Sequence, residues 1–142
     1  MGRLKALVWI LRPGPSGEPE VLLLERPARR GGGEQPVTGK GEAGESAEQC
    51  AAREAREETG LEGRLTELNV VHRFRGKKAD FEEHAFLMAA PTGAEPKLSS
   101  EHVTHRWATP AEAHEALHWT AHRAALDKAV EAFSRAPRGS RA

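Results

Sequence analysis

Six glutamates lie between Gly39 and Leu61, in a segment that reads GKGEAGESAEQCAAREAREETGL. Glu54, Glu57 and Glu58 have the spacing of neighbours on a helix surface, so they project from one face. Like charges at such spacing repel one another unless a cation neutralises them. Carboxylate ligands with open water positions suit Mg²⁺ or Mn²⁺ bound together with a phosphate substrate. The segment therefore predicts a hard divalent cation as cofactor.

The alternative interpretation is an acidic helix surface that is simply solvated. The spacing argues against it, because the segment reads Gly39, five residues, Glu45, seven residues, and then REAREETGL starting at Arg53. This pattern resembles the Nudix box, and all seven of its fixed letters are present. Ala55 and Leu61 take the two apolar positions of the box.

The resemblance implies a hydrolase that cleaves a nucleoside diphosphate linked to another group. A metal-activated water would attack phosphorus. Glu57 and Glu58 are then expected to be metal ligands, and Glu54 to bind metal or act as the general base. The backbone carbonyl of Thr38 is a further expected ligand. Arg53 is expected to pair with a box carboxylate, because a guanidinium matches carboxylate geometry better than an ammonium does.

Several residues are assigned structural roles around these ligands. Glu45 is expected to support the box loop or the metal ligands, and Gly39 and Gly60 frame the box. We place the box helix at about residues 47–59. Ser46 is expected to cap its amino end, and Gly60 to end it in a left-handed conformation.

The substrate phosphates need cations, and two are selected. Arg26 is the preferred phosphate contact, because it ends a core strand and points into the segment that enters the box. Lys40 lies inside the box loop.

Nudix enzymes often use one more acid from outside the box, and the candidates are Glu82, Glu83 and Glu101. Neighbours on a strand point to opposite faces, so only one of Glu82 and Glu83 can face the box helix. We select Glu83 as the additional catalytic acid. The alternative is that Glu83 is a solvent-facing strand residue.

A wider resemblance covers most of the chain. The pieces VLLLER, PVTGKGEAGES, EEHAFLMAAP and SEHVTHRWATPAEA resemble the bacterial dATP and dihydroneopterin triphosphate pyrophosphohydrolases. This resemblance implies that a nucleoside or pterin triphosphate is converted to its monophosphate and pyrophosphate. Two alternatives stay open. One is hydrolysis of ADP-ribose, a dinucleoside polyphosphate or a 5′-triphosphate RNA end, and the other is a non-catalytic ligand-sensing module.

Composition limits the partners. The 142 residues predict one domain over 1–135, and residues 136–142 are expected to be a disordered tail. The 21 basic and 21 acidic residues leave no net charge to hold duplex DNA or an anionic membrane. The single cysteine excludes an internal disulfide, and the apolar run 6–11 is too short for a signal sequence or a span. A cytoplasmic protein is expected, and the family resemblance adds a homodimer as an expectation.

The elements that must position the site follow from hydrophobic periodicity and turn residues. A flexible segment is expected at 27–36. The three tryptophans are expected to pack in the core, and His114, His118 and His122 are expected in surface or packing roles. Strands before and after the box helix, with helices closing the chain, predict an α+β fold with a mixed sheet between helices. This is the α/β/α sandwich that the Nudix resemblance implies. The predicted strands are 4–11, 20–25, 64–74, 81–90 and 102–107, and a helix at 110–135 is expected to break near residues 119–120.

Overall fold

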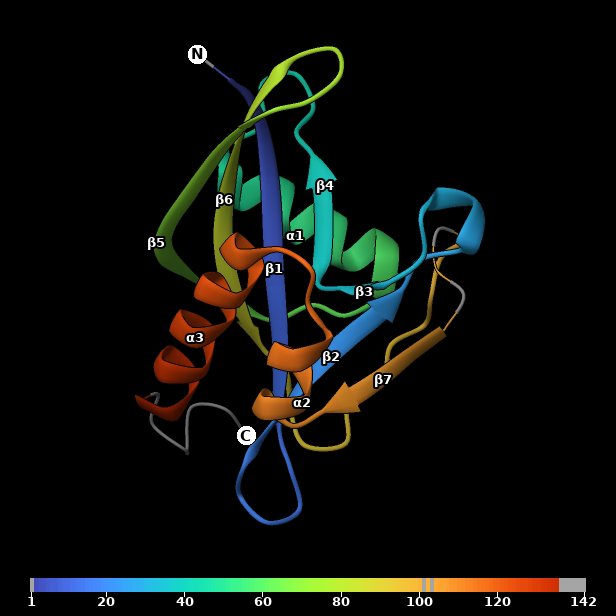
Figure 1. The fold of residues 1–142 in the computed structure, drawn as a ribbon. Coiled ribbons are helices and arrows are strands. Elements are labelled where there is room, and N and C mark those ends of the chain that lie inside the picture. The colour runs from blue at the N-terminus through green and yellow to red at the C-terminus, as the bar shows by residue number, and fades with distance from the viewer. Residues whose placement is uncertain (1, 101, 103, 136–142) are drawn as a thin grey trace.

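The computed structural model describes residues 2–100, 102 and 104–135, and in these it shows a mixed sheet between helices (Figure 1). Glu101 and the tail 136–142 lie outside the described residues. No helix in the described residues is long and apolar enough to cross a membrane. In chain order the elements are β1 (Arg3–Pro13), β2 (Pro19–Glu25), a 3₁₀ turn (Ala28–Arg30), β3 (Glu34–Gln35), β4 (Val37–Lys40), α1 (Ala47–Thr59), β5 (Arg64–Arg75), β6 (Asp80–Ala89), β7 (Thr104–Ala108), α2 (Pro110–Ala116) and α3 (Thr120–Arg135).

Strand β1 is the centre of the sheet. Along one edge it pairs in parallel with β6, from Arg3 opposite Phe81 to Leu11 opposite Ala89. Its other edge is shared, because β4 pairs with residues 5–8 and β2 with residues 11–13, both antiparallel. Strand β2 then diverges to pair with β3 and β7. The sheet therefore opens between β4 and β2, as Figure 1 shows.

The two faces of the sheet bury separate cores. Residues Ala6, Val8 and Ile10 of β1 pack on the side of α1, and Leu7 and Trp9 pack on the side of α2 and α3. Strand β2 is likewise buried on both faces from Val21 to Leu24. The predicted mixed sheet between helices is confirmed.

Helix α1 has the predicted bounds, and its caps explain them. Ser46 Oγ accepts a hydrogen bond from the Gln49 amide at 3.1 Å, and the Ser46 amide donates to Gln49 Oε1 at 2.9 Å. Gly60 ends the helix with φ of 70°, which a residue without a Cβ adopts easily. The expected break in the last helix is also present, at residues 117–119.

Three details differ from the expectations. The segment 27–36 contains a 3₁₀ turn and the short strand β3, and β4 adds a further strand before the box. Trp119 is 64% exposed, so its expected packing role is wrong, whereas Trp9 is fully buried as expected. The short strands escape prediction because each has two to four residues and depends on pairing with distant segments.

Helix α1 approaches the sheet closely because the apolar residues that it buries, Cys50, Ala51 and Ala55, are small. Ala51→Leu adds volume at a site with no exposed surface, so we expect it to lower the free energy of unfolding by about 1–3 kcal/mol. Urea denaturation measures this change. Ala52→Leu, at a partly exposed position on the same helix, is the control and is expected to change stability by less than about 0.5 kcal/mol. Equal effects of the two substitutions would contradict this account of the packing.

Candidate active site

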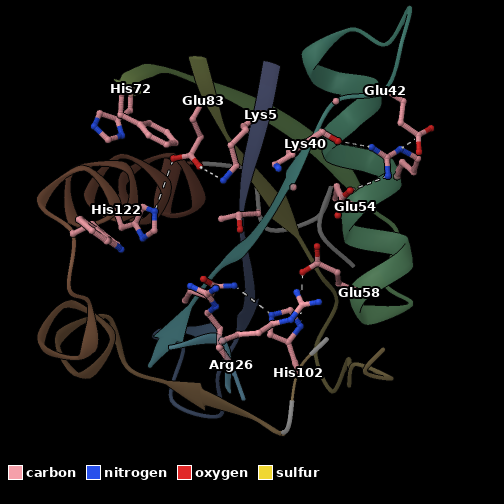
Figure 2. Close-up of a pocket in the computed structure, with 18 of the residues that line it drawn as sticks. Lys5, Arg26, Lys40, Glu42, Glu54, Glu58, His72, Glu83, His102 and His122 are labelled. Atoms are coloured by element: carbon pink, nitrogen blue, oxygen red, sulfur yellow. Dashed lines mark hydrogen bonds and ion pairs between the residues drawn. The ribbon is translucent and has the colours of Figure 1, made fainter. Parts of the chain in front are cut away.

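A cavity of about 930 Å³ lies where the sheet opens (Figure 2). Its size is within the range of small-molecule sites. The sequence-predicted site residues that line it are Arg26, Thr38, Gly39, Lys40, Arg53, Glu54, Glu58 and Glu83. Glu57 is not among the lining residues, and its side chain is 54% exposed. Glu45 and Gly60 also lie outside the lining.

Arg53 holds the box together. Its Nε and Nη2 donate to the two carboxylate oxygens of Glu45 at 2.6 and 3.0 Å. Its Nη1 donates to Glu54 Oε1 at 2.8 Å and to Glu57 Oε1 at 3.0 Å, and its Nη2 also reaches the Lys40 carbonyl at 2.9 Å. These hydrogen bonds, led by the one to Glu45, raise the pKa of Arg53, and the same contact lowers the pKa of Glu45. One guanidinium thus fixes two box carboxylates relative to the box loop.

Gly39 makes room for the Glu54 carboxylate. A Cβ at position 39 would overlap that carboxylate, so only glycine lets Glu54 lie against β4 beside Thr38. Cys50 of α1 also contacts Gly39, and its Sγ lies 3.7 Å from the Gly39 carbonyl oxygen. Burial raises the pKa of the Cys50 thiol to about 11, so the thiol stays protonated and is not a nucleophile.

Glu58 is buried beside an imidazole. Its Oε1 lies 3.8 Å from His102 Nδ1, and both side chains are almost completely enclosed. The other ring nitrogen of His102 lies 3.4 Å from the Gln35 amide nitrogen. His102 therefore separates Glu58 from β3 and restricts where the carboxylate can point, while Glu58 still lines the cavity.

Glu83 lies in the cavity, but not on the side that we expected. It follows the alternation of Ala85 and Leu87, which belong to the core beneath α3, while Phe86 and Met88 belong to the core beneath α1. Glu83 Oε1 accordingly lies 3.9 Å from His122 of α3. The expectation that Glu83 faces the box helix is wrong, because the strand register places the odd-numbered residues of β6 on the opposite face.

Glu82 points the other way and does not line this cavity. It bonds Arg73 at 3.1 Å and lies 3.0 Å from His84 Nε2, and the His84 contact lowers its pKa most.

Several residues that line the cavity were not predicted from the sequence: Lys5, Gln35, His72, Trp119 and His122. Lys5 and His72 are the cross-strand partners of Glu83. Only the register of three strands reveals that neighbourhood, and no short motif in the chain carries it.

The donor set fits a hard divalent cation. Among the described residues no three carboxylates or imidazoles converge closely enough to enclose a metal ion. Mg²⁺ does not require such a cage, because it is usually held by one or two carboxylates together with water and substrate oxygens. Glu54 and Glu58 supply two carboxylates on the wall of one cavity.

Comparison with known proteins finds a matching domain model and a similar sequence. A NUDIX domain model matches residues 1–129. The octanoyltransferase of Myxococcus xanthus is 42% identical over 98 residues, which cover 66% of this chain and 28% of that protein.

Solved structures of other proteins share the fold, and two of them are described next. A C. elegans Ap4A hydrolase complex has a TM-score of 0.79 at 24% identity, covering 93% of this chain and 97% of that one. The E. coli dihydroneopterin triphosphate pyrophosphohydrolase has a TM-score of 0.77 at 24% identity, covering 91% and 95%.

A substitution can test the forked contacts that Arg53 makes with Glu45 and Glu54. Arg53→Lys keeps the charge but loses the fork that bonds Glu45 and Glu54 together, so we expect activity to fall about 10–100-fold. Steady-state turnover measures this loss, and circular dichroism checks that the fold is retained. Arg56→Lys, at an exposed position on the same helix, is the control and should leave turnover unchanged. Full activity of the Arg53→Lys protein would show that the fork is dispensable.

Proposed function

Because this chain belongs to the Nudix family of pyrophosphohydrolases, we propose that it uses Mg²⁺ to cleave a nucleoside or pterin triphosphate into monophosphate and pyrophosphate. Mn²⁺ is the alternative cofactor. Within the family, we propose that the chain belongs with the dATP and dihydroneopterin triphosphate pyrophosphohydrolases. We also propose that the protein forms a homodimer and is located in the cytoplasm.

The observation that supports this function is the pairing of charges in one cavity. Glu54 and Glu58 line it together with the cations Arg26, Arg30 and Lys40. Carboxylates alone would repel a polyphosphate, and cations alone would bind it without activating water. A divalent cation bound there would polarise the phosphoryl oxygens and lower the pKa of the attacking water.

The protein side chains have distinct tasks in this proposal. Glu58, with the backbone carbonyl of Thr38, is a proposed ligand of the cation, and Glu54 is either a further ligand or the general base. Glu57 is also a proposed ligand, and its carboxylate would leave Arg53 and turn inward to reach the cation. Arg53 keeps Glu54 in place through the 2.8 Å hydrogen bond.

The proposed reaction is an in-line displacement at phosphorus. The oxygen of water forms the new P–O bond, and the phosphoanhydride bond between the α and β phosphates breaks. The proton of the water passes to Glu54 where Glu54 is the general base. Arg26 and Lys40 bind phosphate oxygens and offset the negative charge of the leaving group. The match to an octanoyltransferase covers 28% of that protein and gives no ground for acyl transfer by this chain.

The function is tested with purified protein, Mg²⁺ and a panel of nucleoside triphosphates, dihydroneopterin triphosphate, ADP-ribose and dinucleoside polyphosphates. We expect pyrophosphate release from a triphosphate, and ¹⁸O-labelled water reports which phosphorus is attacked. Tight binding of one compound without turnover of any would instead support a ligand sensor.

The box carboxylates give the decisive variants. Glu58→Gln and Glu57→Gln keep the shape of the side chain and remove its charge, so each should lower kcat about 10²-fold or more. The fold should be retained, which circular dichroism and thermal denaturation check. Near-normal kcat in both proteins would show that the metal ligands are misassigned.

Arg26 tests the phosphate contact separately. Arg26→Ala removes a cation from the cavity wall, and we expect KM for the triphosphate to rise about tenfold with a smaller change in kcat. Arg29→Ala is the matched control, because Arg29 lies three residues further along, is exposed and does not line the cavity. Equal KM values for the two variants would remove Arg26 from the site.

A further inference from the structure

A second group of polar side chains lines the cavity on the side away from α1. Lys5, Glu83 and His72 are cross-strand neighbours on β1, β6 and β5, and His122 of α3 lies beside them. Figure 2 shows these four side chains on one side of β4 and the box carboxylates on the other. The phosphate chemistry described above uses none of the four.

Glu83 has hydrogen-bonding capacity that the described residues do not fill. Its side chain is 4% exposed, and its nearest basic atoms are Lys5 Nζ and His122 Nε2, each at 3.9 Å. These distances exceed a hydrogen bond, so both carboxylate oxygens and the ammonium protons remain available to a third group. An enclosed carboxylate without hydrogen bonds destabilises a fold, so a ligand that supplies them is bound strongly.

The charge states around Glu83 follow from burial. Burial raises the pKa of Glu83, and the charges of Lys5 and His72 oppose that rise. Burial also lowers the pKa of His122 to about 4, with His72 and Lys5 adding to the effect, so this imidazole is neutral at pH 7. The Lys5 ammonium, which opposes the rise in the pKa of Glu83, thus lies beside that carboxyl group and next to an uncharged ring.

Aromatic rings adjoin this group. The His72 ring stacks on Phe74 with 5.1 Å between ring centroids, and the exposed Trp119 lines the same cavity. Lys5 Nζ lies 5.6 Å from the centroid of the Phe74 ring. Flat rings stack on such surfaces, so the surroundings suit a flat, polar heteroaromatic group.

The pattern of donors and acceptors distinguishes among such rings. Guanine and pterins present a ring N–H beside an exocyclic amino group and a carbonyl oxygen. A carboxylate accepts from both nitrogens at once, and an adjacent ammonium donates to the carbonyl. Adenine would instead turn a ring-nitrogen lone pair toward the carboxylate. Uracil and thymine offer one N–H between two carbonyl oxygens.

We propose that Glu83 and Lys5 form the specificity site for the ring of the substrate, and that this ring carries the amino-oxo-pyrimidine edge shared by guanine and pterins. The inference rests on the proposed hydrolysis and names its substrate class. Glu83 is thus a residue that binds the ring, in place of the additional catalytic acid that the sequence suggested.

The test compares GTP with ITP, which lacks only the 2-amino group. The wild-type protein should favour GTP in kcat/KM by about 10²-fold, because a site built to bond a substrate amino group discriminates strongly against its absence. Glu83→Gln should bring the two substrates to within about threefold, since the amide cannot accept from both nitrogens. Lys5→Met should lower kcat/KM for GTP and ITP relative to ATP, because both oxo rings lose their donor.

Glu82→Gln is the matched control. It removes the same charge from the neighbouring residue of β6, which points to the opposite face and bonds Arg73. The GTP-to-ITP ratio should stay at its wild-type value. If Glu83 had a purely structural role, Glu83→Gln would lower stability and would lower kcat/KM for all substrates alike. The GTP-to-ITP ratio would then stay unchanged, and that outcome overturns the proposal.

The relative kcat/KM of dihydroneopterin triphosphate and GTP assigns the ring to a pterin or to guanine.

A binding measurement without turnover separates this proposal from the proposed hydrolysis. Calorimetric titration of GTP and ITP in EDTA reports ring recognition without turnover. At least tenfold tighter binding of GTP, lost in Glu83→Gln, supports the site even if no substrate is hydrolysed. Hydrolysis with equal kcat/KM for GTP and ITP refutes the site and leaves the hydrolase intact.

Discussion

The candidate site depends on the guanidinium of Arg53, which joins three parts of the chain. It bonds Glu45 in the box loop, Glu54 and Glu57 on α1, and the carbonyl of Lys40 at the end of β4. Without this cation the carboxylates would repel one another and the loop would have no fixed distance to the helix. A lysine carries the same charge, but its single nitrogen cannot satisfy so many oxygens in one plane.

The second constraint is the way in which β1 shares one edge between β4 and β2. A strand that paired along the whole edge would close the sheet and leave no cavity. Because β4 is short and β2 turns away, residues from both faces of the sheet reach the same space. The box carboxylates come from the α1 side, and Glu83 and His122 come from the α3 side. The proposed phosphate chemistry and the proposed ring recognition would therefore use opposite sides of one cavity.

The parts of this arrangement that sequence could predict are those set by local physics. Ser46 and Gly60 fix the ends of α1 through capping bonds and a left-handed φ, and both signals lie within the segment itself. The face of Glu83 could not be predicted, because alternation says that neighbours diverge but not which of them faces α1. The exposed position of Glu57 also escaped prediction, since helical spacing places it with Glu54 and cannot show that Arg53 binds it outside the cavity.

The Lys5–Glu83 pair is a poor way to stabilise a fold. Its charges are 3.9 Å apart, and the Glu83 carboxylate is nearly enclosed, so it loses hydration without gaining a direct hydrogen bond in return. Apolar side chains of similar volume at these two positions would continue the rows of Leu7 and Ala85 and would cost less. A chain that places such a pair in the wall of a cavity, beside rings on which a ligand can stack, has the charge arrangement of a binding site. The energetic cost of this pair and its unfilled hydrogen-bonding capacity thus belong to the same two side chains, as expected of residues that bind a ligand.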